Sequence, residues 1–169
     1  ICEGALRILD LAKHCKTNKI KAAGLCDSNN LCGALEFSEL IAKSKTQPII
    51  GTQINVQYKS YIGKIPLFAK DLEGYKNLIK LSSKSYLGIK DNEEPHCKID
   101  DIENNYKGLI LLTGSFDGLI GKLFFKNLSE EIFLLLKKFN KIFDDNFYIE
   151  IQRHGDDGEK LFEKFLLST

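Results

Sequence analysis

The chain has 169 residues, of which 43% are hydrophobic, and its formal net charge is +1. This length allows one domain with a sizeable core, and the near-neutral charge gives no general attraction to nucleic acid or acidic lipid. Arg7 and Arg153 are the only arginines. Bidentate contacts to bases usually use arginine, so the composition argues against sequence-specific DNA reading.

The chain contains five cysteines, which are Cys2, Cys15, Cys26, Cys32 and Cys97. Their odd number and the lack of a CxxC pair favour free thiols in a reducing cytosol. No signal peptide is apparent, and the apolar runs are too short to span a bilayer. We therefore expect a cytoplasmic protein without a membrane partner. Because the sequence lacks methionine and begins at Ile1, we also expect a fragment of a longer polypeptide.

Helix and strand periodicities alternate along the chain. In chain order they predict a helix over 3–16, a strand over 22–26, a helix over 32–45, strands over 48–58 and 65–70, a helix over 71–86, a strand over 108–114, a helix over 127–143, a strand over 147–152 and a helix over 157–167. This alternation favours an α/β fold with a mainly parallel sheet or barrel, formed as one domain over 1–169.

Several local signals refine these elements. Gly63 is expected in the turn between two strands, and Asp71 can cap the helix that follows it. Asn127 and Glu130 have the spacing of a capping box. The stretch 91–104 is acidic and contains a proline, which predicts an exposed loop.

The helix over 71–86 has an apolar pattern and a row of lysines. Its inward residues are expected to be Tyr75, Leu78, Ile79, Ser82 and Tyr86. Its lysines, Lys76, Lys80 and Lys84, recur every four residues on the opposite side. A solvated face is the simpler interpretation of this row, and contact with DNA phosphates or an acidic partner is the alternative.

Active residues of α/β folds lie where strands end. Here those positions carry Asp27, Ser115 and His154. Asp27 is either a metal ligand or base, or a carboxylate that accepts loop N–H groups or caps the next helix. Ser115 is a nucleophile or a turn residue, and the turn is favoured because no Gly-x-Ser-x-Gly elbow is present. A surface or hydrogen-bonding role is favoured over catalysis for His154, and His14 and His96 are expected to be exposed.

Six segments in a fixed order carry a family resemblance: EGALRILDLAKHCK, LCDSNNLCGALEFSE, PIIGTQINV, LFAKDLEGYKNLIKLSSKSYL, GLILLTGSFDGLIGKL and FYIEIQRHG. Together they resemble the PHP (polymerase and histidinol phosphatase) domain of the alpha subunit of bacterial DNA polymerase III. The resemblance implies a distorted, seven-stranded β/α barrel, here truncated at both ends. It also implies that active members hold about three divalent metal ions at their strand ends and hydrolyse phosphoesters.

The ligand positions implied by this resemblance can be followed in the chain. The Asp-His pair of the family is represented by Asp27 and Ser28, a glutamate by Gln53, a histidine by Lys64 and a cysteine by Ser115. Of these, only Asp27 retains a ligand side chain. Neutral Gln and Ser are poor ligands for Zn²⁺ or Mn²⁺, and an ammonium group repels a cation. The resemblance therefore predicts a vestigial metal site with no cofactor of its own.

Three functions remain open. The first is a catalytically inactive scaffold within a replicative polymerase, supporting the rest of the alpha subunit and docking the proofreading exonuclease subunit. In that case the intact polypeptide would synthesise DNA with Mg²⁺ and contact DNA elsewhere. The second is an active metal-dependent phosphoesterase or 3'-5' exonuclease. The third, a free-standing phosphatase of small metabolites, is disfavoured by the polymerase-like segment around GYKNLIKLSS.

Overall fold

The computed structural model describes residues 6–90 and 92–168. The helices in these ranges are α1 (Ile8–Thr17), α2 (Ala34–Lys43), α3 (Leu72–Leu87), α4 (Ile99–Asn104), α5 (Leu119–Phe125), α6 (Ser129–Phe143) and α7 (Glu159–Ser168), with a 3-10 turn η1 (Asp144–Asn146). The strands are β1 (Ala22–Ser28), β2 (Gln47–Tyr58), β3 (Tyr61–Ala69), β4 (Cys97–Lys98), β5 (Leu109–Leu112) and β6 (Phe147–Tyr148).

The strands form one mixed sheet in the order β1-β2-β3-β5-β6, and β4 pairs with β2. β1 and β4 run parallel to β2, and β6 runs parallel to β5. β3 is antiparallel to both β2 and β5. The α/β class is thus confirmed, but the expectation of a mainly parallel sheet is wrong. The expected barrel is not found in the described residues either, because their sheet is not closed.

A tight hairpin between β2 and β3 explains the antiparallel pairs. Tyr58 faces Tyr61 in the register, so Lys59 and Ser60 form a two-residue turn, and Lys59 has a positive φ of 54°, typical of such turns. Gly63 is therefore not in the turn, as expected from the sequence, but inside β3 opposite Val56. A Cβ on Gly63 would lie 2.5 Å from the Cα of Leu119, so glycine is required there by the close packing of α5.

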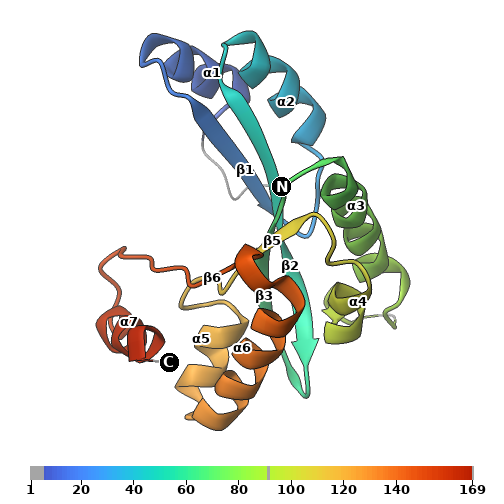
Figure 1. The fold of residues 1–169 in the computed structure, drawn as a ribbon, viewed down its shortest axis with the longest axis vertical. Helices are drawn as coiled ribbons and strands as arrows, with labels where there is room; N and C mark the ends of the chain where they lie inside the picture. Colours follow the sequence, from blue (N-terminus) through green and yellow to red (C-terminus); the bar gives the residue numbers. More distant parts are fainter. Residues whose placement is uncertain (1–5, 91, 169) are drawn as a thin grey trace.

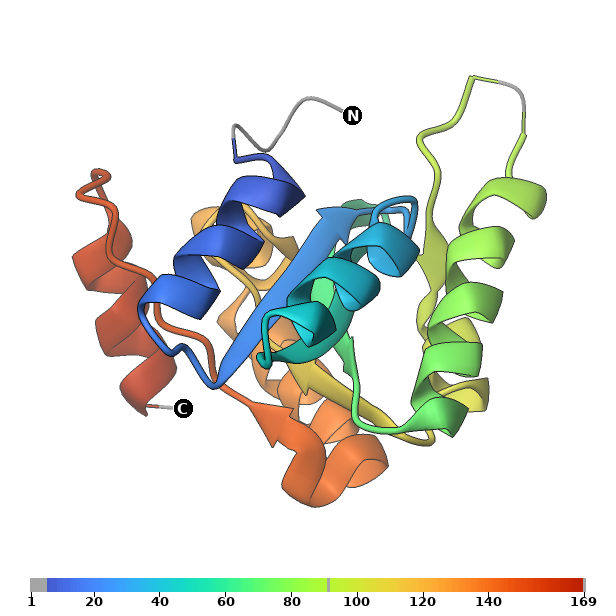
Figure 2. The ribbon, with the colours of Figure 1, turned by 90° about the horizontal axis from the view of Figure 1, so that it is seen from above.

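The helices pack two apolar cores against the sheet. The larger core joins β2, β3 and β5 to α3, α4, α5, α6 and α7. The smaller core joins α1 and α2 to β1 and β2. Figure 1 shows α1 and α2 together at one end of the molecule and α5 and α6 at the other. Figure 2 shows α3 and α7 at opposite margins.

The predicted cap of α3 is confirmed, but its predicted inward face is partly wrong. Asp71 accepts a hydrogen bond from the Gly74 N–H at 2.8 Å. The buried residues are Gly74, Asn77, Leu78, Leu81 and Ser85. Ile79 and Tyr86 are 44% and 51% exposed. The helix is rotated relative to the expectation because its small residues, Gly74 and Ser85, face the sheet.

Other boundaries also differ from the sequence expectations. The stretch 91–104 is not only a loop, because it contains β4 and α4, and α5 had no counterpart in the prediction. α6 begins after Leu128 without a side-chain cap, so the capping box of Asn127 and Glu130 does not form. Only Phe147–Tyr148 of the strand expected over 147–152 is in the sheet. The helix expected over 3–16 corresponds to α1, and the first three residues of the expected range lie outside the described residues.

Candidate functional site

The face of the sheet opposite the large core carries most of the proposed ligand positions. Ser28 pairs with Gln53, and Gln53 pairs with Pro66, so these residues share one face. Lys64 pairs with Asn55, one step further along the same face. The structure therefore brings Ser28, Gln53 and Lys64 together on what we call the polar face of the sheet.

Asp27 lies on the other side of β1. It pairs with Thr52, whose side chain is fully buried. A Cβ on Gly33 would lie 3.4 Å both from Oδ2 of Asp27 and from Cδ2 of Leu25, which packs against the core of α1 and α2. The one retained ligand side chain is thus directed toward α2 and away from Ser28 and Gln53.

The loop after β1 is held by asparagines. Asn29 accepts a hydrogen bond through Oδ1 from the Asn55 N–H at 2.8 Å, and its own N–H donates to the Gln53 carbonyl at 2.8 Å. Asn30 accepts from the Cys32 N–H and donates to the Ser28 carbonyl. α2 begins after Gly33 without a side-chain cap. The expected capping of α2 by Asp27 is therefore wrong, and Asn29 and Asn30 bind the loop backbone instead.

Ser115 follows β5 in a loop that approaches the polar face. A Cβ on Gly114 would lie 3.1 Å from Pro66 Cδ and 3.4 Å from the Lys64 carbonyl oxygen. The Ser115 hydroxyl donates to Asp117 at 2.9 Å, and the Gly118 N–H donates to the Ser115 carbonyl. These contacts are those of a turn, as the sequence analysis favoured.

Glu150 lies beside the polar face of the sheet, although it was not among the ligand positions proposed from the sequence. Its N–H donates to Thr113 Oγ1 at 2.9 Å, and its Oε1 accepts from the Gln152 amide at 2.5 Å. Its Oε2 is buried and has no hydrogen-bond partner among the described residues, and the same holds for the Ser28 hydroxyl oxygen. Burial, then the charge of Glu150, and then that of Asp27 raise the pKa of Cys26 to about 12. Glu150, which follows β6, therefore acts electrostatically on Cys26 of β1.

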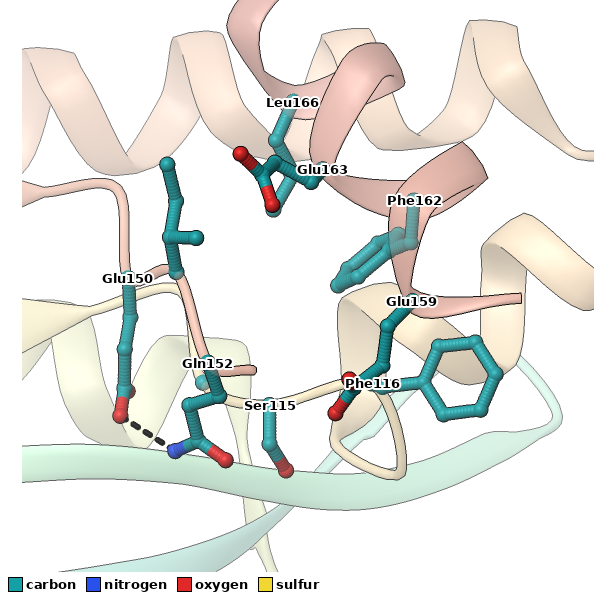
Figure 3. Close-up of a pocket in the computed structure, with 10 residues that line it drawn as sticks. Ser115, Phe116, Glu150, Gln152, Glu159, Phe162, Glu163 and Leu166 are labelled. Atoms are coloured by element: carbon teal, nitrogen blue, oxygen red, sulfur yellow. Dashed lines mark hydrogen bonds between the residues drawn. The ribbon is translucent and has the colours of Figure 1, made fainter. Parts of the chain in front are cut away.

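A small cavity lies beside Glu150 (Figure 3). Its polar wall comes from Ser115, Glu150 and Gln152, and Phe162 and Leu166 of α7 supply apolar walls. In Figure 3 the Gln152 amide points toward Glu150, to which it is hydrogen-bonded. The other amide atom of Gln152, Oε1, lies 3.1 Å from Nε2 of His154. His154 thus has the hydrogen-bonding role that the sequence analysis favoured.

Two glutamates of α7 near this cavity are already engaged. Glu159 is 8% exposed and accepts hydrogen bonds from three consecutive backbone N–H groups, those of residues 154–156. The bond from His154, followed by those from Gly155 and Asp156, holds its pKa below the ordinary value. Glu163 forms a two-point ion pair with Arg153, at 2.9 and 2.6 Å. Both carboxylates therefore fasten α7 to the chain after β6.

The lysine row of α3 is not uniform. Lys76 and Lys80 are exposed, and within the described ranges neither lies within 4 Å of a carboxylate. Lys84 pairs with Asp101 of α4 at 2.5 Å. This hydrogen bond raises the pKa of Lys84. Lys84 is exposed, as a solvated face requires, but it is also paired with a carboxylate of the fold.

Across residues 6–90 and 92–168, no three His, Cys, Asp or Glu side chains are grouped closely enough to hold a metal ion. His14 is exposed, as expected, and lies near Asn18, but His96 is half-buried and contacts the Glu94 carbonyl. No helix in the same ranges is long and apolar enough to cross a membrane. Cys2 lies outside the described residues.

A mixed sheet covered by helices, with a polar face at its strand ends, defines an α/β domain of the kind that carries a strand-end site. Residues 1–154 match the PHP domain family. The chain belongs to the PHP domain family, as the resemblance of its sequence segments had implied.

The relatives agree on one kind of protein. The chain is 37% identical over 162 residues to the DNA polymerase III subunit alpha of Rickettsia felis, covering 95% of this chain and 13% of the relative. It is 36% identical to the protein of that name from Caulobacter vibrioides and 35% identical to that of Borreliella burgdorferi, covering 92% of this chain in each case. The chain spans only 13–14% of the length of these relatives.

Proposed function

We propose that this chain is the PHP region of a DNA polymerase III alpha subunit, and that it is a metal-free structural module within that polypeptide. The intact polypeptide would be a DNA-directed DNA polymerase that works in the bacterial cytoplasm with Mg²⁺. The relatives named DNA polymerase III subunit alpha support this proposal. Because the chain corresponds to 13–14% of their length, nucleotidyl transfer is assigned to parts outside these residues.

The polar face carries the argument for a metal-free module. Neutral Ser28 pairs with neutral Gln53, Lys64 lies next to them, and Asp27 is on the opposite side of β1. A cluster of divalent ions needs several converging carboxylates, imidazoles or thiolates to offset the repulsion between the ions. The residues at the family's ligand positions do not provide this set, so we derive no hydrolytic step from them.

A second candidate is a metal-dependent phosphoesterase or 3'-5' exonuclease. One observation favours it, which is the buried and unpartnered Oε2 of Glu150 beside the polar face. A carboxylate in this position can bind a cation or a water molecule. It is a single ligand, however, and a nucleophile-generating metal site needs at least two more.

A nuclease assay separates the two candidates. The full-length polypeptide, treated with chelator and then supplied with Mn²⁺ or Zn²⁺, would be incubated with end-labelled single-stranded DNA. We expect no product attributable to this domain, and Asp27→Ala and Glu150→Gln should leave any background cleavage unchanged. Metal-dependent cleavage that is lost in Glu150→Gln would establish the phosphoesterase in place of the scaffold.

The proposed scaffold has two protein contacts, the remainder of the alpha subunit and the proofreading exonuclease subunit. The exonuclease contact is tested by hydrogen–deuterium exchange on the full-length polypeptide, with and without the purified exonuclease subunit. We expect slower exchange in peptides from within residues 6–168 when the exonuclease is added. Protection found only outside these residues would remove the docking role from this domain.

A further inference from the structure

The solvent side of α3 carries a second apolar row, separate from the face that packs on the sheet. We call it the outer row of α3, and it consists of Leu72, Tyr75, Ile79, Ser82 and Tyr86. Leu72, Ile79 and Tyr86 are 68%, 44% and 51% exposed. These positions are spaced by three, four, three and four residues, which is the spacing of the contact positions in helix–helix seams. Four of the five side chains are apolar or aromatic.

Leu72, Ile79 and Tyr86 of this row are exposed, whereas Tyr75 and Ser82 are half-buried. α3 contacts β2, β3, β4 and β5 of the sheet, and it does so through Gly74, Asn77, Leu78, Leu81 and Ser85. Figures 1 and 2 both show α3 at the margin of the molecule. Three exposed apolar side chains in one row along four turns of a helix are typical of a protein-binding surface.

The charges beside the row select the kind of partner. At about 100° per residue, Lys76 and Lys80 lie together on the solvent flank of the outer row. Lys80 only reaches the Asn77 side chain, at 3.3 Å. Lys84 is neutralised by Asp101. The edge of the apolar seam thus carries two lysines and one glutamate, Glu73, and its net positive charge is complementary to carboxylates.

This combination favours a protein helix over DNA. Phosphate binding is supplied by clustered cations and gains nothing from covering Leu72 or Ile79. α3 carries three lysines and no arginine, and because Lys84 is paired with Asp101, the helix forms a weak phosphate site. A helix with its own apolar stripe would instead bury the outer row and place Asp or Glu residues against the lysines.

We propose that the outer row of α3 docks an amphipathic helix of a partner protein whose apolar stripe is bordered by acidic residues. The apolar stripe packs on Leu72, Ile79 and Tyr86, and the acidic border pairs with Lys76 and Lys80. This surface is separate from the polar face of the sheet, so it does not depend on whether that face binds metal.

The test uses the full-length polypeptide and two labelled helical peptides of about three heptads. Both peptides carry leucine at the contact positions, and the flanking positions are glutamate in one and lysine in the other. Fluorescence anisotropy should show that the glutamate peptide binds at least about tenfold more tightly. The double variant Ile79→Asp, Tyr86→Asp should abolish binding, and Lys76→Glu, Lys80→Glu should reverse the preference between the peptides.

Two controls accompany these variants. Leu35→Asp changes an exposed leucine of α2 (72% exposed) and should leave peptide binding unchanged. Thermal midpoints should match the parent protein because every changed side chain is exposed. Equal affinity for the two peptides, or a preference that survives Lys76→Glu, Lys80→Glu, would overturn the proposal. Duplex DNA binding that is lost in that lysine variant, without peptide binding, would overturn it in favour of phosphate contact.

Discussion

Gly74 of α3 lies directly against the backbone of Gly108, which precedes β5. A Cβ on Gly74 would lie only 1.8 Å from the Gly108 carbonyl oxygen, and Gly108 itself has a φ of +69°. The same carbonyl accepts a hydrogen bond from the Lys70 N–H at 2.8 Å. This contact fixes the start of α3 against the sheet and sets which face of the helix is buried.

Gly74→Ala should therefore destabilise the protein by about 2–3 kcal/mol, because backbone must move to admit the methyl group. Gly24 provides a matched control, since a Cβ there meets nothing within 4 Å. Gly24→Ala should change the free energy of unfolding by less than about 1 kcal/mol, in the stabilising direction. Urea denaturation measures both, and similar losses in the two variants would contradict the contact.

Asn29 closes the loop after β1, and its left-handed φ of 53° is easier for asparagine than for most residues. Asn29→Ala should cost about 2–3 kcal/mol, because the Asn55 N–H loses its acceptor and the backbone strain is retained. Asn29→Asp keeps the acceptor and should cost less. Urea denaturation of the two variants checks this order, and an aspartate variant as unstable as the alanine variant would show that the Asn55 bond is unimportant.

Cys26 and Cys32 should differ strongly in reactivity. Burial and the charge of Glu150 raise the pKa of Cys26 to about 12, so very little thiolate is present at pH 8. Cys32 is exposed. N-ethylmaleimide should therefore modify Cys32 far faster, as followed by mass spectrometry of the native protein. Glu150→Gln should raise the rate at Cys26, and an unchanged rate would mean that Glu150 does not reach β1.

Glu159 should make the stability depend on pH. Its pKa is lowered from 4.5 by the backbone hydrogen bonds of His154, Gly155 and Asp156. The folded state then binds its proton less readily than the unfolded state, so the stabilisation is present above about pH 4.5 and is lost as the pH falls further. Glu159→Gln should lower the thermal midpoint at pH 7, and the difference from the parent protein should shrink below pH 4.5.

The control for this prediction is Glu36→Gln, at an exposed position of α2, which should show no comparable pH-dependent difference. A Glu159→Gln effect that stays constant down to pH 3 would show that the amide cluster does not bind the ionised carboxylate.

Sequence reasoning succeeded where the signal was local. The period-two pattern placed β2, and the Asp71 cap placed the start of α3, because each depends on residues a few positions apart. It failed at Ile79 and Tyr86, since α3 has two apolar faces and only the packing of Gly74 on Gly108 selects between them. The Lys59–Ser60 turn had no glycine or asparagine to reveal it.

The candidate site was predicted in part. The positions of Ser28, Gln53 and Lys64 came from the family resemblance, and the register confirms that they share a face. Side chains alternate along β1, so Asp27 points to the opposite side of the strand from Ser28. That Asp27 is thereby directed toward α2 could be seen only once the position of this helix was known. The influence of Glu150 on Cys26 joins residues far apart in sequence, one just after the edge strand β6 and the other in the edge strand β1. No local pattern carries such information.

The central claim is that the polar face holds no metal cluster, and elemental analysis of the purified full-length polypeptide tests it most directly. The comparison is between that polypeptide and a variant carrying Ser28→His, Gln53→Glu, Lys64→His and Ser115→Cys, which supplies the family's ligand types. Each protein is dialysed against Zn²⁺ and Mn²⁺, and free metal is then removed. We predict that the natural polypeptide retains no more of either metal than its variant Asp27→Ala, Glu150→Gln does. One or more equivalents retained by the natural polypeptide and lost in that double variant would contradict the account.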